Sequence, residues 1–316
     1  MYPRELLVRV SWLYYIEGMT QKEIATMLDI SRIKVTRILD KAKKEGLVYI
    51  DIIDPLTNCL QIERDLKTLF HLKDAMVVPT VDDKIEKIKD SLGKATAIYL
   101  RRILRNNMIL ATAWGSTISY VIPYLKPKKV LGLKVVSIMG GLAPGSRENP
   151  FEIASKIATI FGGESYYLHA PAVTDSEKTS NILMEQEQVR LIFSMAKQAN
   201  IGLVSIGDTT STSTLIKVGF LTYDDLEAVK KNGAVGEILG RYYDINGNKI
   251  PSIIDKRIIG LDLDEIKQIE NVIGVSGGPV KVEPLLGAIR GGYIDTLITD
   301  EETAKALILK GKKKEV

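Results

Sequence analysis

The first fifty residues show apolar positions with a helical period. Apolar side chains recur every three or four positions in three stretches, which short polar breaks separate, and Gly46 ends the last of them. A run rich in Val, Ile and Tyr follows and favours a strand. We therefore predict helices over 4–17, 21–28 and 32–44, and a strand over 47–53.

The residues between these helices predict how each helix begins. Thr20 precedes the second helix and Glu23 stands three residues later, which is the pattern of a capping box. Ser31 caps the third helix, and only Asp29 and Ile30 make the turn before it. Asp adopts the left-handed backbone less readily than Gly but does adopt it. Three short helices with a tight turn between the last two predict a helix-turn-helix domain, with the following strand as its wing.

The outward face of the third helix carries basic and polar side chains that can reach base edges and phosphates from a major groove. The alternative is a small helical subdomain with an ordinary solvated basic face. The capping box, the turn length and the basic third helix together favour DNA binding. The residues expected to contact DNA are Thr20, Gln21, Ser31, Arg32, Ile33, Lys34, Thr36, Arg37 and Lys41.

The distribution of charge supports this interpretation. The net charge of the 316 residues is +4, and the first fifty hold nine basic and six acidic side chains. Six of the nine basic residues lie between Arg32 and Lys44, where Asp40 is the one acid. The remainder of the chain is close to neutral, so the basic character belongs to the predicted DNA-binding domain.

Composition excludes several other classes of protein. The chain is 45% hydrophobic and 26% charged, which is typical of a globular protein. Its one cysteine, Cys59, forms no internal disulfide and fits a reducing compartment. No uncharged apolar run of about 18 residues occurs, and the start of the chain lacks the pattern of a secretory signal. We expect a cytoplasmic protein.

Beyond a linker at 54–58, strand patterns alternate with helical ones, which predicts an α/β fold with a mostly parallel sheet covered on both faces. We predict domains over 1–53 and 54–316. The expected strands are 75–79, 108–113, 134–139, 201–206, 272–275 and 296–299. The expected helices are 59–70, 85–104, 116–124, 150–161, 187–198, 223–231 and 301–309.

Four loops at predicted strand ends are rich in glycine, hydroxyl or basic residues, namely 113–117, 139–149, 205–213 and 275–281. Ligands of parallel sheets bind at the carboxyl ends of strands. Glycines permit close approach of the backbone, and N–H groups, hydroxyls and basic side chains bind anions. Each loop alone is more often a plain turn, but the four together predict a site for a phosphorylated ligand. No GxGxxG motif follows a strand, so a dinucleotide site has little support.

Several motifs resemble the SorC family of sugar-binding transcriptional regulators over essentially the full length. The most specific are Gly-Gly-Pro-Val-Lys at 277–281, Leu-Gly-Ala-Ile-Arg-Gly-Gly-Tyr at 286–293 and Leu-Ile-Thr-Asp-Glu at 297–301. The others are Met-Thr-Gln-Lys-Glu-Ile-Ala at 19–25, Trp-Gly-Ser-Thr at 114–117, Gly-Gly at 140–141, Gly-Ala-Val-Gly-Glu-Ile at 233–238 and Tyr-Asp at 243–244.

The resemblance implies a winged helix-turn-helix domain joined to an effector domain with the fold of sugar-phosphate isomerases and deaminases. It also implies a tetramer that binds double-stranded operator DNA under control of a phosphorylated sugar; a dimer is also possible. The residues that it implies for the effector are Gly140, Gly141, Glu237 and Lys281. Our wider set of effector residues adds Gly115, Ser116, Thr117, Arg147, His169 and Asp244.

We therefore expect a transcriptional regulator of a carbohydrate catabolic operon. We expect a repressor, although the sequence does not separate a repressor from an activator. We expect no catalysis, no metal, no cofactor and no membrane partner. The alternative is an isomerase- or deaminase-like enzyme fused to a DNA-binding domain, in which Glu237 and Asp244 could form an acid–base pair. The 233–241 segment has no His of the kind that deaminases place beside a Gly-rich loop. A third reading is an oligomerising scaffold with a vestigial pocket.

Overall fold

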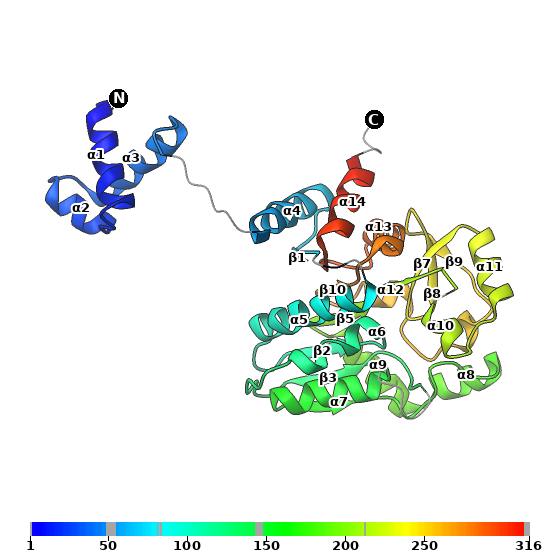
Figure 1. Cartoon of the computed structure of the whole chain (residues 1–316). Helices are drawn as coiled ribbons and strands as arrows, with labels where there is room; N and C mark the ends of the chain where they lie inside the picture. The colour runs from blue at the N-terminus through cyan, green and yellow to red at the C-terminus, as the bar shows by residue number, and fades with distance from the viewer. Residues whose placement is uncertain are drawn as a thin grey trace. The chain divides into compact units, whose positions relative to one another are not determined.

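The computed structural model describes residues 2–48, 55–80, 82, 84–142, 148–211 and 213–312. The chain divides into two compact units, Met1–Asp54 and Pro55–Val316 (Figure 1). We call them the head and the effector unit, and each is described by itself.

The head packs three helices around one apolar core in its described residues, which confirms the predicted helix-turn-helix. Leu7, Val10, Ile24, Val35 and Ile38 are buried in this core. The helices are α1 (Arg4–Tyr15), α2 (Gln21–Met27) and α3 (Arg32–Lys44).

The predicted caps are confirmed. The Thr20 hydroxyl accepts a hydrogen bond from the Glu23 N–H, and the Glu23 carboxylate accepts one from the Thr20 N–H at 2.7 Å. Ser31 accepts from the N–H of Lys34 at the start of α3. Asp29 takes a φ of +50°, the left-handed conformation that the turn requires. The strand predicted as a wing falls mostly on residues 49–53, which lie outside the described residues.

The effector unit begins with helix α4 (Pro55–Phe70), four residues earlier than the sequence pattern predicts. The expected linker at 54–58 is therefore largely helical. Pro55 is the first residue of the helix, a position that tolerates proline because its N–H would lack an intrahelical partner in any case.

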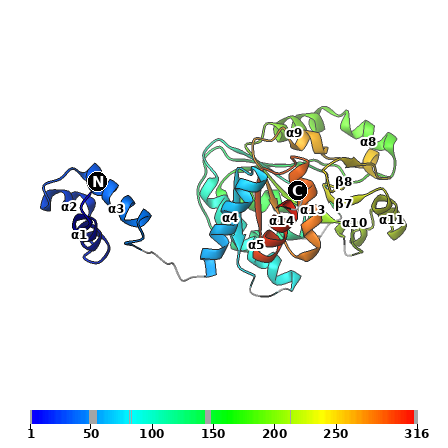
Figure 2. The same ribbon diagram turned by 90° about the horizontal axis from the view of Figure 1, so that it is seen from above.

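Among the described residues, seven parallel strands form the central sheet, in the order β1-β11-β10-β5-β2-β3-β4. Helices surround this sheet (Figures 1 and 2). Every residue of β10 and β11 is buried, so both faces of the sheet are covered. Six of these strands match the predictions to within two residues, and β4 was missed because it is only three residues long. The strands are β1 (Asp74–Val78), β2 (Ile109–Thr112), β3 (Lys134–Ser137), β4 (Glu164–Tyr166), β5 (Ile201–Ser205), β10 (Val272–Val275) and β11 (Thr296–Asp300).

The helix predicted over 116–124 is instead two short pieces, α6 (Ser116–Ser119) and the 3-10 turn η1 (Ile122–Tyr124). Pro123 explains the break, since it has no N–H for Ser119 and its ring clashes with that carbonyl in a continuous helix. The other helices are α5 (Ile85–Ile103), α7 (Pro150–Phe161), α8 (Glu177–Met184), α9 (Glu187–Lys197), α10 (Thr214–Lys217), α11 (Tyr223–Lys231), α12 (Leu263–Ile266), α13 (Val282–Arg290) and α14 (Glu301–Lys312), with 3-10 turns η2 (Asp255–Arg257) and η3 (Pro279–Lys281).

A second, antiparallel sheet was not predicted. It has the order β6-β7-β8-β9 within the described residues, and the Gly-Ala-Val-Gly-Glu segment forms β7. Its strands are too short, and too rich in glycine, to show a clear period of two. They are β6 (Gly207–Asp208), β7 (Ala234–Ile238), β8 (Arg241–Asp244) and β9 (Lys249–Ile250).

The strand order places a switch point between β2 and β5. From β2 the chain runs outward through β3 to β4, whereas β5, β10 and β11 follow one another on the opposite side. A crevice for ligands forms at the carboxyl ends of the strands where the order reverses. A ligand site is therefore expected at the loops that leave β2 and β5.

Candidate functional site

The loops after β2 and β5 touch each other at the switch point. Gly115 has a φ of +150°, and a Cβ added there would lie 2.2 Å from the Ser205 Oγ. The Ser205 hydroxyl in turn approaches the Trp114 carbonyl, at 3.4 Å. Glycine at 115 thus allows the two strand ends to meet.

The loop after β10 places Lys281 against the loop after β5. Gly278, with a φ of +99°, donates its N–H to the buried Asp300 at 2.8 Å, which fixes the start of η3. The Lys281 ammonium then donates to the Asp208 carboxylate at 2.6 Å and to the Ile206 carbonyl at 3.0 Å. Lys281 therefore lies at the end of β5, next to the switch point.

The two charges of this pair are mostly removed from solvent, with side-chain exposures of 15% for Lys281 and 9% for Asp208. Burial acts to raise the pKa of Asp208, but the Lys281 ammonium and the hydrogen bonds from Lys281 and Thr210 outweigh it and hold that pKa below its ordinary value. The carboxylate is therefore charged at neutral pH.

Glu237 projects from β7 into the same region and is only 6% exposed. Its carboxylate accepts the Gly240 N–H at 2.7 Å. Its other oxygen packs on Gly207, where an added Cβ would lie 1.7 Å from it. Burial raises the pKa of Glu237 to about 7, although the Gly240 hydrogen bond and the Lys281 charge both act to lower it.

Tyr242 lies directly across from Glu237 in the β7–β8 pair, so both side chains project from the same face of the small sheet. Its hydroxyl is buried and has no hydrogen-bond partner within the described residues. Burial raises the pKa of Tyr242, and the charges of Glu237 and Asp208 raise it further. An unpartnered buried hydroxyl next to two carboxyl groups is a group that a ligand can satisfy.

Lys89 of α5 lies within electrostatic range of both Lys281 and Lys217 of α10. Burial lowers the pKa of Lys89 and these two ammonium groups lower it further, while the carboxylates of Glu86 and Glu148 act to raise it. Lys89 is half-buried and forms no ion pair or hydrogen bond with the described residues. A half-buried ammonium beside two others is unfavourable unless an anion offsets them.

Gly141, the second residue of the first glycine pair, lines a cleft of about 520 Å³ after the end of β3, together with Leu142, Phe151, His169, Ala170, Pro171 and Phe220. The N–H groups of Gly140 and Gly141 already donate to the carbonyls of Ile259 and Ala170, both at 2.8 Å. A Cβ at Gly140 would lie 2.2 Å from the Pro171 carbonyl oxygen, and one at Gly141 would lie 2.5 Å from the Phe151 ring. The two glycines therefore make room for these protein neighbours, and their N–H groups are already used. Of the effector residues predicted from the sequence, Gly141 and His169 line this cleft.

The remaining predicted effector residues lie in different places. Ser116 and Thr117 begin α6 beside Gly115, and Thr117 is buried. Arg147 lies outside the described residues. The structure does not bring Asp244 to Glu237, because its carboxylate accepts the N–H groups of Asn246 and Asn248 and closes the β8–β9 turn.

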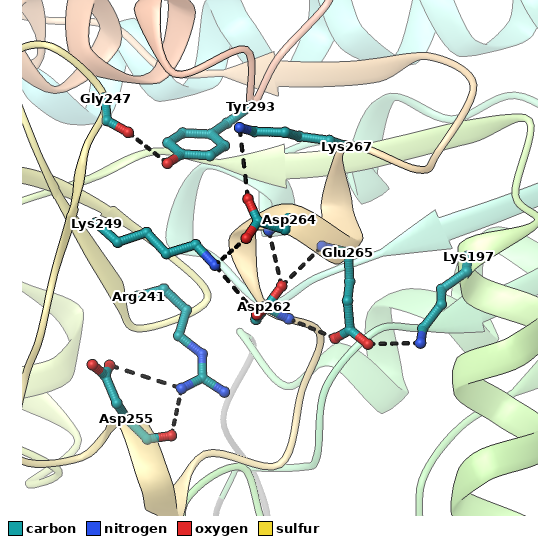
Figure 3. Close-up of polar contacts among 10 residues, drawn as sticks. All are labelled: Lys197, Arg241, Gly247, Lys249, Asp255, Asp262, Asp264, Glu265, Lys267 and Tyr293. Atoms are coloured by element: carbon teal, nitrogen blue, oxygen red, sulfur yellow. Dashed lines mark hydrogen bonds and ion pairs between the residues drawn. The ribbon is translucent and has the colours of Figure 1, made fainter.

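Polar contacts attach the small sheet to the rest of the effector unit (Figure 3). Lys249 of β9 contacts Asp262 at 3.3 Å and Asp264 at 2.6 Å, both at the start of α12. Glu265 of α12 pairs with Lys197 of α9 at 2.6 Å. This network holds the sheet that carries Glu237 and Tyr242 in place.

Sequence reasoning missed Lys89, Lys217, Tyr242 and the role of Asp208. Asp208 stood in a predicted loop and could have been included by its position just after β5. The two lysines carry no signal, since each is one of several on a short or amphipathic helix. Tyr242 becomes recognisable only once β7 and β8 are paired.

In the head, α3 presents the predicted DNA-contacting face to solvent. Arg32, Ile33, Lys34, Thr36 and Arg37 are all exposed, as are Thr20 and Ser31. Gln21 is half-buried and its side chain accepts the Thr36 hydroxyl at 2.9 Å, which joins α2 to α3. Lys41 is half-buried and lies 3.5 Å from Glu45.

Comparison with known families agrees with this arrangement. The family described as "Putative sugar-binding domain" matches residues 54–309, and "Sigma-70, region 4" matches residues 10–44. A helix-turn-helix head joined to a sugar-binding domain defines a class of transcriptional regulators. Among the described residues, none of the helices is long and apolar enough to cross a membrane.

Individual relatives are similar over nearly the whole chain. The deoxyribonucleoside regulator of Bacillus subtilis is 32% identical, over 96% of this chain and 97% of its own. The erythritol catabolism regulatory protein EryD of Brucella abortus is 28% identical, over 96% of each. The full-length sorbitol operon regulator SorC of Klebsiella pneumoniae superposes with a TM-score of 0.75 and 27% identity, over 96% of this chain and 98% of that one. The chain belongs to the SorC family of sugar-binding transcriptional regulators.

Proposed function

We propose that this regulator binds operator DNA through α3 and a phosphorylated sugar at the carboxyl edge of its parallel sheet, and that the sugar changes its affinity for the operator. The observation that carries the proposal is the lysine cluster. The Lys89 ammonium interacts electrostatically with Lys281, which lies at the end of β5, and with Lys217, and Asp208 is the one carboxylate within ion-pair distance of any of the three among the described residues.

A phosphate group fits this excess of positive charge. It supplies up to two negative charges and several acceptor oxygens, which relieve the repulsion among the three ammonium groups. The sugar then lies toward Glu237 and Tyr242, where a carboxyl group and an unpartnered hydroxyl can bind its hydroxyl groups. The Asp208 carboxylate already pairs with the Lys281 ammonium. The ligand therefore either displaces that carboxylate or binds the ammonium together with it.

The effector part is tested by replacing Lys281 with alanine in the full chain. We expect Lys281→Ala to bind operator DNA with unchanged affinity and to lose its response to the phosphorylated sugar. Lys230→Ala is the matched control, because that lysine pairs with Glu227 on the surface of α11. An unchanged response in Lys281→Ala would remove this lysine from the site.

The DNA part is tested with Arg37→Ala. Arg37 is exposed on the outward face of α3 and makes no hydrogen bond or ion pair with the described residues. We expect this variant to lose operator binding, measured by gel shift on DNA flanking the gene, and to keep its thermal stabilisation by the effector. Operator affinity equal to that of the wild type would contradict the assignment of α3.

We propose further that the site binds its sugar without turning it over. The relatives are named as regulators. Asp244 closes a turn rather than pairing with Glu237, which leaves the acid–base pair of the enzymatic alternative without its second member. Incubating the protein with the bound sugar phosphate and finding product formed in proportion to protein concentration would favour the enzyme instead.

We propose that the regulator acts in the cytoplasm, where its operator lies, and as a homo-oligomer. A symmetric oligomer presents paired heads to a pseudo-palindromic operator. A tetramer is the state we expect from the family resemblance, and sedimentation of the full chain measures it directly.

A further inference from the structure

The head carries an exposed apolar stripe that its own core does not use. Val8, Trp12 and Ile16 follow one another at intervals of four along α1, and each is about half exposed or more. Leu7, Val10 and Leu13 of the same helix face the core. Met27, at the end of α2, is 59% exposed beside the stripe. Val8, Trp12 and Met27 line a groove of about 850 Å³, together with Arg4, Glu5, Arg9, Leu13, Glu17 and Leu28.

The groove lies apart from the DNA-contacting face. None of its lining residues belongs to α3, whose exposed side chains include Arg32, Lys34 and Arg37. The groove therefore shares no residue with the predicted DNA-contacting set. An aromatic side chain surrounded by aliphatic ones on an exposed surface is typical of a protein interface.

The charges beside the stripe indicate what covers it. Arg4, Glu5 and Arg9 are exposed and form no ion pair with the described residues. Glu17 lies at the opposite end of the stripe, where its carboxylate accepts the Trp12 indole N–H at 3.1 Å and so fixes the ring on the surface. The start of the stripe thus carries two arginines and one carboxylate, a net positive charge, and its end carries the Glu17 carboxylate.

When two copies of α1 pack antiparallel, the positive start of one stripe lies opposite the negative end of the other. A two-fold axis between residues 10 and 11 places Arg4 of one copy opposite Glu17 of the other. It also places Arg9 opposite Trp12, a pairing of guanidinium and indole that is itself favourable. Packing the helices parallel would instead set Arg4 against Arg4, Glu5 against Glu5 and Arg9 against Arg9, which is repulsive.

We propose that α1 of the head packs antiparallel on α1 of a second copy of this chain, with Trp12 at the centre of the contact. A pair of twelve-residue helices buries less surface than a free-standing dimer needs. The contact therefore forms between heads that the rest of the oligomer holds at high local concentration. The proposal rests on the proposed function for the oligomer that holds the heads together and for the use of paired heads at the operator.

Cysteine cross-linking of the full chain without DNA tests the contact independently of operator binding. Antiparallel helices 8–10 Å apart place the two copies of residue 9 about 10 Å apart and the two copies of residue 4 more than about 20 Å apart. Arg9→Cys and Arg4→Cys are matched variants, since both remove an exposed arginine from α1. A bis-maleimide with a reach of about 10 Å is the probe, and the wild-type chain, whose Cys59 is buried, sets the background.

We expect Arg9→Cys to cross-link at least fivefold more than Arg4→Cys. Adding Trp12→Glu to Arg9→Cys should abolish the excess, whereas Tyr223→Glu, at an exposed aromatic residue of the effector unit, should leave it unchanged. Equal cross-linking at both positions would show a parallel or non-specific contact and overturn the proposal, as would background cross-linking at both. Because no DNA is present, loss of the cross-link and loss of operator binding are separate results.

Discussion

At the scale of single residues, the candidate site depends on three side chains, Lys281, Asp208 and Glu237. The Lys281 ammonium, 2.6 Å away, helps to outweigh burial and hold the pKa of Asp208 below its ordinary value. Glu237 has no cation within bonding distance among the described residues and is a buried acid with a pKa of about 7. The same cluster thus offers a phosphate an ammonium and offers a sugar a carboxyl group that can donate or accept a proton.

The Glu237 carboxyl group makes stability depend on pH. Between its ordinary pKa of 4.5 and about 7, the folded chain holds a proton on Glu237 that the unfolded chain has released. Raising the pH through this window therefore destabilises the fold, by at most about 1.4 kcal/mol per pH unit. Glu237→Gln keeps an acceptor for the Gly240 N–H and removes the titration.

We therefore expect Glu237→Gln to melt close to the wild type at about pH 5 and above it at about pH 7.5. Thermal unfolding of both proteins across this range measures the difference. A constant difference in Tm from pH 5 to 7.5 would show that Glu237 does not titrate there.

Gly207 is a second residue-scale test, because its backbone touches the Glu237 carboxylate. A Cβ at 207 would lie 1.7 Å from a Glu237 oxygen. Gly207→Ala should therefore lower the free energy of unfolding by about 1–3 kcal/mol. Since the clash is with one side chain, adding Glu237→Ala should recover most of the loss in urea unfolding. A double variant as unstable as Gly207→Ala would place the strain elsewhere.

At the scale of elements, each prediction from sequence succeeded where one physical cause dominates. The capping hydroxyls of Thr20 and Ser31 set where α2 and α3 begin, and the short β-branched runs of β10 and β11 favour strands by themselves. The small sheet was missed because β6 and β9 have two residues each and are stabilised by pairing with β7 and β8, which no local pattern records.

The residues of the candidate site also divide into those that a sequence motif predicted and those that it did not. Lys281 and Glu237 were predicted from motifs, and both lie in the cluster. Lys89 was not predicted because its place beside Lys281 depends on how α5 packs against the loop after β10, where its Ile85 and Ile88 contact Gly278. Contacts between distant segments are not visible in one sequence.

Two matched capping boxes provide an element-scale prediction. Thr20 caps α2 through Glu23, and Thr222 caps α11 through Asp225, with the same reciprocal hydrogen bonds. Thr20→Ala should weaken α2 by about 1 kcal/mol and Thr222→Ala should weaken α11 by the same amount. Hydrogen exchange should then speed up about fivefold at 21–28 in the first variant and at 223–231 in the second. Faster exchange at both segments in either variant would contradict a local effect.

At the scale of the whole molecule, the head and the effector unit have separate cores and separate ligands. A ligand of the effector unit changes operator binding only if it binds one arrangement of the oligomer more tightly than another. The proposed effector site is built from loops after β2, β5 and β10 and from the small sheet, so we expect a sugar that contacts all of them to favour the arrangement in which they are closest.

The most direct test of the central claim is the thermal stability of the full chain in a panel of phosphorylated sugars and polyols, each paired with its dephosphorylated form. We expect at least one phosphorylated compound to raise the Tm of the wild type by several degrees, its dephosphorylated form to have no effect, and Lys281→Ala to show no shift with either. A panel without any shift, or an equal shift from the dephosphorylated partner, would contradict the assignment of the lysine cluster as a phosphosugar site.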